Sequence, residues 1–320
     1  MRKFVFYTSL AVAVVFSASA MAQTVGIAAS KKGSLYDRSA TVLAKIVTNK
    51  GGMNATVRNF ASPNVYLPGI DKGQVDFGLA NRYEFGLAVE GKEHFKGRPM
   101  GNLRVVSIMY PLRVAFFVKK DSPIQSIADL KGKTMPAGYV AHKIIHKLMV
   151  TLMATEGMSP KDFGKQVPVP NVVAGANAFI SGKSDGFFFA LSAPKVREAN
   201  AKHGIRAIDV ANTPANLAAI RKHIPIAYFR KEMPHKGNPG VTKPIHAMAY
   251  DALVFTHKGV SDDSVYKMAK AMHDNLKDLG KAFPPFRLLK ANGMAKNLGS
   301  SKYHPGAIKF YKEKGLWPPK

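Results

Sequence analysis

The sequence predicts an α/β protein built from two doubly wound lobes that are joined by hinge strands. Strand and helix patterns alternate along almost the whole chain, which is typical of helices packed on the faces of sheets. The 320 residues are enough for two lobes of ordinary size. One α/β unit is interrupted by another, so the chain has to cross between the two and return.

The first lobe is predicted to begin with alternating strands and helices. Between the first two strands, Gly33 and Ser34 open a helix whose apolar residues fall on one side, and Gly51 ends it. Farther along, Pro111 separates two strand-like runs. The expected strands of this part are residues 24–29, 55–59, 75–80, 103–110 and 113–119.

The middle of the chain repeats this scheme as a unit of its own. Residues 142–156 have paired apolar positions at helical spacing, and Gly157 stops the helix. Pro and Gly then crowd residues 234–244, which predicts a loop. Further helices are expected over residues 176–180 and 194–203, and strands over residues 134–138, 167–173, 186–190 and 205–210.

The last part of the chain returns to the first lobe. Residues 248–256 predict a long apolar strand, and Ser261 caps a helix whose apolar face extends to Leu279. Strand 113–119 going out and strand 248–256 coming back are the candidate hinge. We therefore expect lobe 1 to comprise residues 23–115 and 245–320, and lobe 2 to comprise residues 116–244.

The N-terminus predicts export. Arg2 and Lys3 precede an apolar stretch over residues 4–16, and the small residues up to Ala22 form a cleavage site. A signal peptide over residues 1–22, cleaved after Ala22, is favoured over a retained anchor, because the apolar core is shorter than a membrane helix of about 20 residues. With no cysteine, the chain has no lipid-attachment site, disulfide or zinc–thiolate site. The expected location is the periplasm.

The chain is strongly basic, and the excess is dispersed. The formal net charge of +27 falls to +25 once Arg2 and Lys3 leave with the signal peptide. This charge indicates either a solvated surface or a positive field that attracts anionic ligands or an acidic partner. Nucleic acid is not an expected partner, because no nucleic-acid fold signature or basic amphipathic helix is present.

Polar residues at the ends of predicted strands mark a candidate binding cleft. Open α/β sheets bind ligands where strand ends and helix N-termini converge, and free N–H groups there attract carboxylates or phosphates. Each of these residues could instead simply cap a helix, stabilise a turn or lie on the surface. The candidate ligand-binding residues are Ser34, Tyr36, Ser62, Asn64, Asn81, Arg82, Tyr110, Tyr139, His142 and Phe189.

Catalytic and metal motifs are missing from the sequence. It contains no H-E-x-x-H, G-x-S-x-G, G-x-G-x-x-G or P-loop pattern. His142 and His146 are four residues apart, a spacing that fits a metal pair, but no third His or carboxylate lies near them in sequence. No catalytic residue, metal ion or cofactor is therefore expected.

Six motifs in order resemble the TAXI group of solute receptors, the extracytoplasmic subunits of TRAP transporters. They are residues 33–36, 73–81, 102–110, 127–133, 181–189 with Ala193-Pro194, and 304–315. The resemblance implies a type II periplasmic-binding-protein fold and a non-catalytic, monomeric receptor that delivers its solute to membrane subunits. It also implies organic-acid ligands such as glutamate or 2-oxoglutarate, and places Ser34, Tyr36 and Asn81 at ligand-facing positions.

Two departures from that family concern the predicted cleft. Residues 60–63 replace a Thr-Gly-Gly-Ser-like loop, and residues 141–144 replace a Gly-Ser-Gly-Thr-like helix opening. The hydroxyl and amide groups for a carboxylate are thus altered on both lobes, and His142 or Lys143 would supply a charge instead. Two other functions stay open: a periplasmic enzyme on the same two-lobed scaffold, and a basic adaptor for acidic partners.

Overall fold

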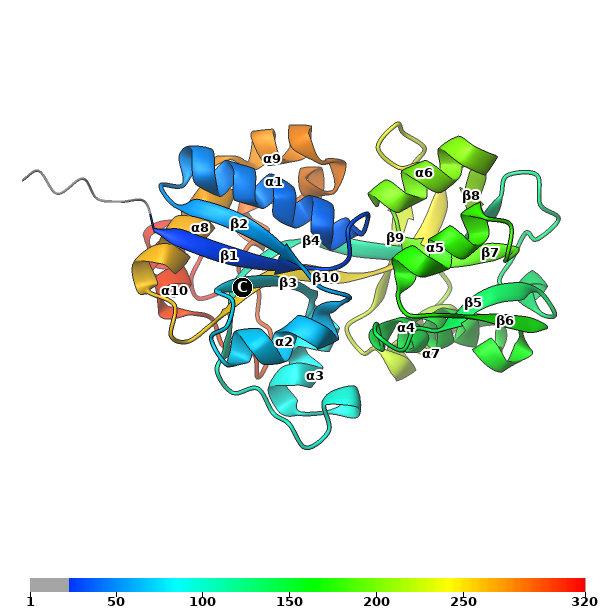
Figure 1. Cartoon of the computed structure of the whole chain (residues 1–320), viewed down its shortest axis with the longest axis horizontal. Coiled ribbons are helices and arrows are strands. Elements are labelled where there is room, and N and C mark those ends of the chain that lie inside the picture. The colour runs from blue at the N-terminus through cyan, green and yellow to red at the C-terminus, as the bar shows by residue number, and fades with distance from the viewer. Residues whose placement is uncertain (1–22, 320) are drawn as a thin grey trace, which may run out of the picture.

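Two lobes lie side by side in the computed structural model, which describes residues 23–319 (Figure 1). The expected signal peptide and its cleavage site at Ala22 lie outside the described residues. Across residues 23–319, no helix combines the length and apolar character needed to cross a membrane. The predicted two-lobed α/β fold is confirmed.

Lobe 1 begins with three parallel strands, each followed by a helix. Strand β1 lies between β2 and β3, and strand β3 is completely buried. Helix α1 covers one face of the sheet, and α2 and α3 cover the other (Figure 1). The elements are β1 (Thr24–Ala29), α1 (Leu35–Lys50), β2 (Asn54–Asn59), α2 (Pro63–Asp71), β3 (Phe77–Asn81) and α3 (Arg82–Glu90).

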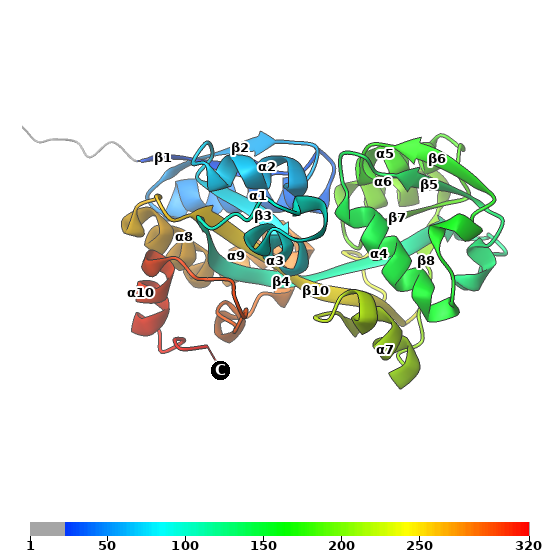
Figure 2. The same ribbon diagram turned by 90° about the horizontal axis from the view of Figure 1, so that it is seen from below.

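Two long antiparallel strands connect the lobes. Strands β4 (Leu103–Lys119) and β10 (Ile245–His257) pair along their length and run from one lobe into the other (Figure 2). Pro111 pairs opposite Asp251 and does not interrupt β4, so the two runs expected there are one strand. A proline is tolerated where its missing N–H is not needed in the ladder.

Lobe 2 forms on the far ends of these strands. Strands β7 and β8 pair with β4, β9 pairs with β10, and β5 and β6 form a separate parallel pair. Pairing of β10 changes from β9 to β3 between Ala249 and Ala252. The elements are β5 (Thr134–Gly138), α4 (Ile144–Met153), β6 (Lys165–Val169), α5 (Val172–Ile180), β7 (Gly186–Ala190), α6 (Pro194–His203), β8 (Ile205–Ala207), α7 (Pro214–His223) and β9 (Tyr228–Glu232).

The C-terminal helices pack back on lobe 1. Helix α8 (Asp262–Asp274) contacts α1 and α10 (Pro305–Glu313), and α9 (Leu276–Ala282) follows α8 after a break at Asn275. Ser261 caps α8 as expected, accepting from the Ser264 N–H.

A buried polar network lies beside the crossing strands. Arg113 on β4 donates to the Glu232 carboxylate at 2.9 Å, and both side chains are almost fully buried. Asn238 donates to the same Glu232 oxygen at 3.1 Å, and Ser192 donates to Asn238 at 3.0 Å. These bonds tie the lobe 2 side of the hinge into one unit.

Several elements differ from the sequence prediction. Residues 167–173 are not a single strand, because β6 ends at Val169 and α5 begins at Val172 with Asn171 as its cap. The helix expected from Ser261 to Leu279 is divided into α8 and α9 at Asn275. Helices α2, α3 and α7 and strand β9 have no counterpart among the predicted elements.

Candidate functional site

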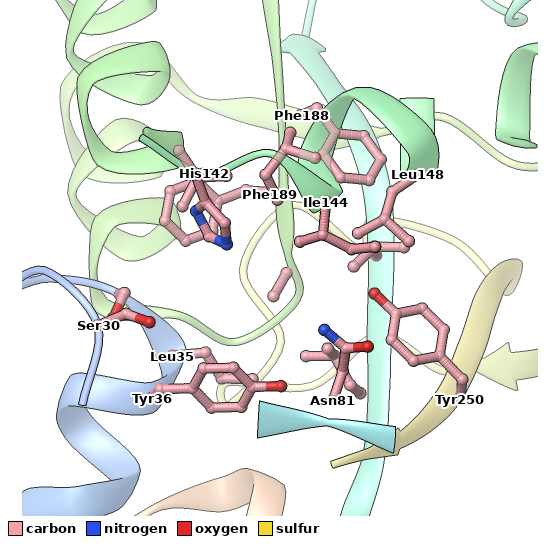
Figure 3. Close-up of a pocket in the computed structure, with 16 residues that line it drawn as sticks. Ser30, Leu35, Tyr36, Asn81, His142, Ile144, Leu148, Phe188, Phe189 and Tyr250 are labelled. Carbon is pink, nitrogen blue, oxygen red and sulfur yellow. The ribbon is translucent and has the colours of Figure 1, made fainter. Parts of the chain in front are cut away.

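A small cavity of about 50 Å³ lies between the two lobes, against the crossing strands (Figure 3). Its lobe 1 side consists of residues from the turn between β1 and α1, the start of α1, and strands β3, β4 and β10. Its lobe 2 side consists of residues from the start of α4, the start of α5 and strand β7. The cavity is thus located where helix N-termini and strand ends converge, the usual ligand position in α/β proteins.

The start of α1 supplies free backbone donors to the cavity. Gly33 has φ +89°, which a residue with a Cβ rarely adopts, and this turn leads directly into the helix. Ser34 caps the helix through its hydroxyl, which accepts from the Asp37 N–H at 3.1 Å. Leu35 and Tyr36 both line the cavity, and N–H groups of a first helical turn have no acceptor within the helix.

Two tyrosine hydroxyls in the cavity wall are buried and have no partner within residues 23–319. They belong to Tyr36 on α1 and Tyr250 on β10. Burial raises the pKa of each phenol well above its usual value, so both are neutral hydrogen-bond donors. Leaving a buried hydroxyl unbonded costs about 1–3 kcal/mol. A ligand that accepts from these hydroxyls recovers this energy.

Asn81 lines the same wall, but both polar atoms of its amide are already bonded to Glu84. Its oxygen accepts from the Glu84 N–H at 2.7 Å, and its nitrogen donates to a Glu84 carboxylate oxygen at 3.1 Å. Glu84 is fully buried, which raises its pKa, while hydrogen bonding by His94 acts in the opposite direction. The bonds between Asn81 and Glu84 fix the start of α3 and place a carboxyl group behind the cavity wall.

His142 is the polar side chain on the lobe 2 wall. Burial lowers its pKa to about 3, and the nearby His94 adds to this effect, so its imidazole is neutral. Its Nδ1 has no partner among the described residues. The rest of the lobe 2 wall is apolar, formed mainly by Ile144, Leu148, Val172, Phe188 and Phe189.

Direct bonds across the mouth of the cavity hold the lobes together. The Ser62 hydroxyl donates to the Ala141 carbonyl. The Asn64 side-chain oxygen accepts from the Lys143 N–H at 3.1 Å. Further contacts join Lys195 N to the Gly33 carbonyl at 3.1 Å, Tyr83 to the His223 carbonyl at 3.2 Å, and Lys147 to Glu93 at 3.0 Å. The structure is therefore a closed form.

The structure separates the ten candidate residues into three groups. Ser34, Tyr36, Asn81, His142 and Phe189 line the cavity. Ser62 and Asn64 do not line it but form the contact between the lobes described above. Arg82, Tyr110 and Tyr139 lie elsewhere.

Arg82, Tyr110 and Tyr139 each have a different environment. Arg82 donates to the Asn297 carbonyl at 3.2 Å on the outer surface. Tyr110 is buried in lobe 1, where its hydroxyl bonds to Ser39 and its ring packs against Phe286. Tyr139 is fully buried behind the lobe 2 wall, with its hydroxyl near Gly175.

The sequence pattern did not identify Tyr250 or the apolar residues of α4 as cavity residues. Tyr250 lies within a long apolar strand, so nothing local marks it as different from core residues. Its position becomes visible only when β10 is placed across both lobes. The proposed metal pair is also incomplete, because no group of three or more His, Asp or Glu side chains suited to a metal ion occurs within residues 23–319.

Two α/β lobes closed on a cavity at their crossing strands define the periplasmic-binding-protein-like class of folds. Residues 27–315 match the model of the NMT1-like family, and the chain belongs to this family. Solved structures with the same fold support the assignment of the class.

One similar structure is described as a periplasmic transporter; it has 16% sequence identity and a TM-score of 0.53 over 92% of this chain and 94% of the other. Another is MatC from Rhodopseudomonas palustris with bound malate, at 13% identity and a TM-score of 0.55 over 82% and 88%. A third is the binding-protein component of an ABC phosphonate transporter from Pseudomonas aeruginosa, at 10% identity and a TM-score of 0.52 over 84% and 81%.

Proposed function

We propose that this chain is an exported periplasmic receptor that captures a small organic carboxylate between its lobes. In this proposal the signal peptide is cleaved after Ala22, and the loaded receptor delivers its solute as a monomer to a TRAP-type permease, as in the TAXI group that its motifs resemble. The observation that carries the binding function is the pair of Tyr36 and Tyr250 hydroxyls, which have no partner within residues 23–319, in a cavity lined by both lobes.

A carboxylate suits the donors on the lobe 1 wall. The Leu35 and Tyr36 N–H groups of α1 and the hydroxyls of Tyr36 and Tyr250 are donors that lack acceptors within residues 23–319. The positive end of the α1 macrodipole adds a further attraction for an anion. Charge-assisted hydrogen bonds contribute about 1.5–3 kcal/mol each, so several of them approach the ~8 kcal/mol that micromolar affinity requires.

Lobe closure couples binding to a change of shape. His142 and the apolar side chains of lobe 2 reach the solute only when the lobes are shut, whereas Tyr36 and Tyr250 are on lobe 1. A ligand that contacts both walls therefore shifts the population toward the closed form. The closed form presents a distinct surface, and that surface is what the permease would recognise.

A thermal-shift screen of organic acids and amino acids tests this function. We expect at least one acid to raise the melting temperature in a saturable manner, because a ligand that binds only the folded state stabilises it. The same acid should be recovered chemically unchanged after incubation. No stabilisation by any acid, or conversion of one of them into a product, would overturn the proposal.

A further inference from the structure

The two walls of the cavity differ in polarity. The lobe 1 wall contains Ser30, Ser34, Tyr36, Asn81 and Tyr250, and these are the polar lining residues apart from His142. On the lobe 2 wall, Ile144, Leu148, Val172, Phe188 and Phe189 present hydrocarbon side chains. Figure 3 shows the tyrosines and Asn81 on one side of the cavity, facing Phe188, Ile144 and Leu148 on the other. A ligand that fills this space meets donors on one side and apolar surface on the other.

Cationic side chains do not line the cavity. None of its lining residues within 23–319 is Lys, Arg, Asp or Glu. His142 is neutral, because burial lowers its pKa to about 3. Burial raises the pKa of both Tyr36 and Tyr250, and Glu84, which is buried and bonded to Asn81, adds to this effect. A charge buried without a partner is costly, so a second carboxylate against the lobe 2 wall would be unfavourable.

We infer that the solute carries a single carboxylate head and a compact, branched or aromatic hydrocarbon body. The head bonds to the first N–H groups of α1 and to the hydroxyls of Tyr36 and Tyr250. The body packs against Leu148, Phe188 and Phe189 of lobe 2. This inference rests on the proposed receptor function, but it excludes the dicarboxylates glutamate and 2-oxoglutarate that the family resemblance implied.

The small volume supports a compact body. The cavity of about 50 Å³ lies between lobes that contact each other through Ser62, Asn64 and Lys195. An extended chain or a sugar would hold the lobes apart and break these bonds. We expect a short branched acid to be accommodated without breaking them.

Two matched pairs of ligands test the inference by isothermal titration calorimetry on the mature protein. 4-Methyl-2-oxopentanoate and 2-oxoglutarate share an α-keto acid head, and leucine and glutamate share an amino acid head. Within each pair, a hydrocarbon end replaces the second carboxylate. We expect 4-methyl-2-oxopentanoate to bind at least tenfold more tightly than 2-oxoglutarate, with a negative heat-capacity change from the burial of its apolar end.

Small-angle scattering on the same samples separates the possible failures. Equal or tighter binding of 2-oxoglutarate or glutamate, with compaction of the protein, would overturn the single-carboxylate inference and leave the receptor function intact. If all four acids neither bind nor change the scattering profile, the inference is wrong, and the thermal-shift screen of other acids then decides the receptor function.

A variant tests the assignment of the head group. Tyr250→Phe removes one hydroxyl that has no partner within residues 23–319 and keeps the ring. We expect the affinity for 4-methyl-2-oxopentanoate to fall at least tenfold while the melting temperature of the free protein does not fall. An unchanged affinity would show that this hydroxyl does not hold the carboxylate.

Discussion

The Lys147 ammonium of lobe 2 lies 3.0 Å from the Glu93 carboxylate of lobe 1 and joins the two lobes. Glu93 also accepts from the Tyr83 hydroxyl at 2.9 Å. Both charged side chains are about one-third exposed, with 30% and 35% of their surface accessible. This ion pair exists only while the lobes are shut, so it links surface charge to the equilibrium between open and closed forms.

Glu93→Gln should weaken ligand binding slightly. The amide keeps an oxygen for Tyr83 but loses the charge that attracts Lys147, and exposed ion pairs are worth about 0.2–1 kcal/mol. We therefore expect a reduction in affinity of at most about fivefold, and a smaller one at high salt. The control is Asp263→Asn, which removes the Lys267 pair within α8 and should not alter affinity. A loss of similar size in the control would contradict the role of the pair in closure.

Tyr36→Phe should weaken ligand binding without lowering the stability of the free protein. The hydroxyl has no partner in the described chain, so its removal should leave the melting temperature of the free protein unchanged or raise it. Ligand affinity should fall about 10- to 150-fold, because the lost bond to a carboxylate is worth about 1.5–3 kcal/mol. Calorimetry and thermal denaturation measure the two effects.

Tyr311→Phe is the matched control for Tyr36→Phe. Its hydroxyl is buried outside the cavity and donates to the Val106 carbonyl at 2.9 Å. This variant should lose about 1 kcal/mol of stability and keep its affinity. The opposite pattern, with Tyr36→Phe destabilised and binding normally, would assign Tyr36 to the core instead of the site.

Glu232→Gln should destabilise the hinge strongly. Removing the charge leaves the buried Arg113 guanidinium without a counter-ion, which costs about 3–5 kcal/mol in similar buried pairs. Denaturant titration should show this as a lower unfolding midpoint. Glu198→Gln, which removes an exposed carboxylate paired with Lys195, should lower the free energy of unfolding by less than about 1 kcal/mol. Equal midpoints for the two variants would contradict the importance of the buried network.

We expect the closed form to lose stability in acid, because His142 is buried and neutral in that form. Its pKa is about 3 in the closed form and near 6.5 when exposed, so between these values the open or unfolded form binds a proton that the closed form does not. Stability therefore rises with pH through this window, by at most about 1.4 kcal/mol per pH unit. The slope should fall to about half its maximum near pH 6.5 and vanish roughly one to two pH units above it.

The variant His142→Gln isolates this contribution. It removes the titrating ring, and the neighbouring His94 and Glu84 remain. The fall in melting temperature between pH 7 and pH 4.5 should be smaller in the variant than in the wild-type protein. Identical pH profiles would show that His142 does not titrate between the two forms.

Much of the fold could be predicted because its strands and several helices have regular apolar spacing. The bounds of β1, β5, β7 and α6 agree with the sequence pattern, and each has a clear apolar run or a Pro or Gly at its end. Helix α7 could not be found in this way, because Ile220 is its one fully buried residue and, apart from Leu217, its other positions are polar or small. Its place depends on contacts with α4, which the local sequence does not contain.

Part of the site could be predicted because several of its residues lie at the ends of regular strands or the starts of helices. Ser34, Tyr36 and Asn81 directly follow strands or open helices, and such positions converge at the edge of an α/β sheet. Tyr250 was missed because it lies within a crossing strand among apolar neighbours. Arg82, next to Asn81, points to the outer surface because α3 begins there and turns the chain away from the cavity.

Small-angle scattering of the mature protein with and without 4-methyl-2-oxopentanoate, 2-oxoglutarate, leucine and glutamate tests the account most directly. We predict that at least one of these acids reduces the radius of gyration in a saturable manner and is recovered unchanged. A profile that stays the same with every acid, while one of them is converted into a product, would contradict capture by lobe closure.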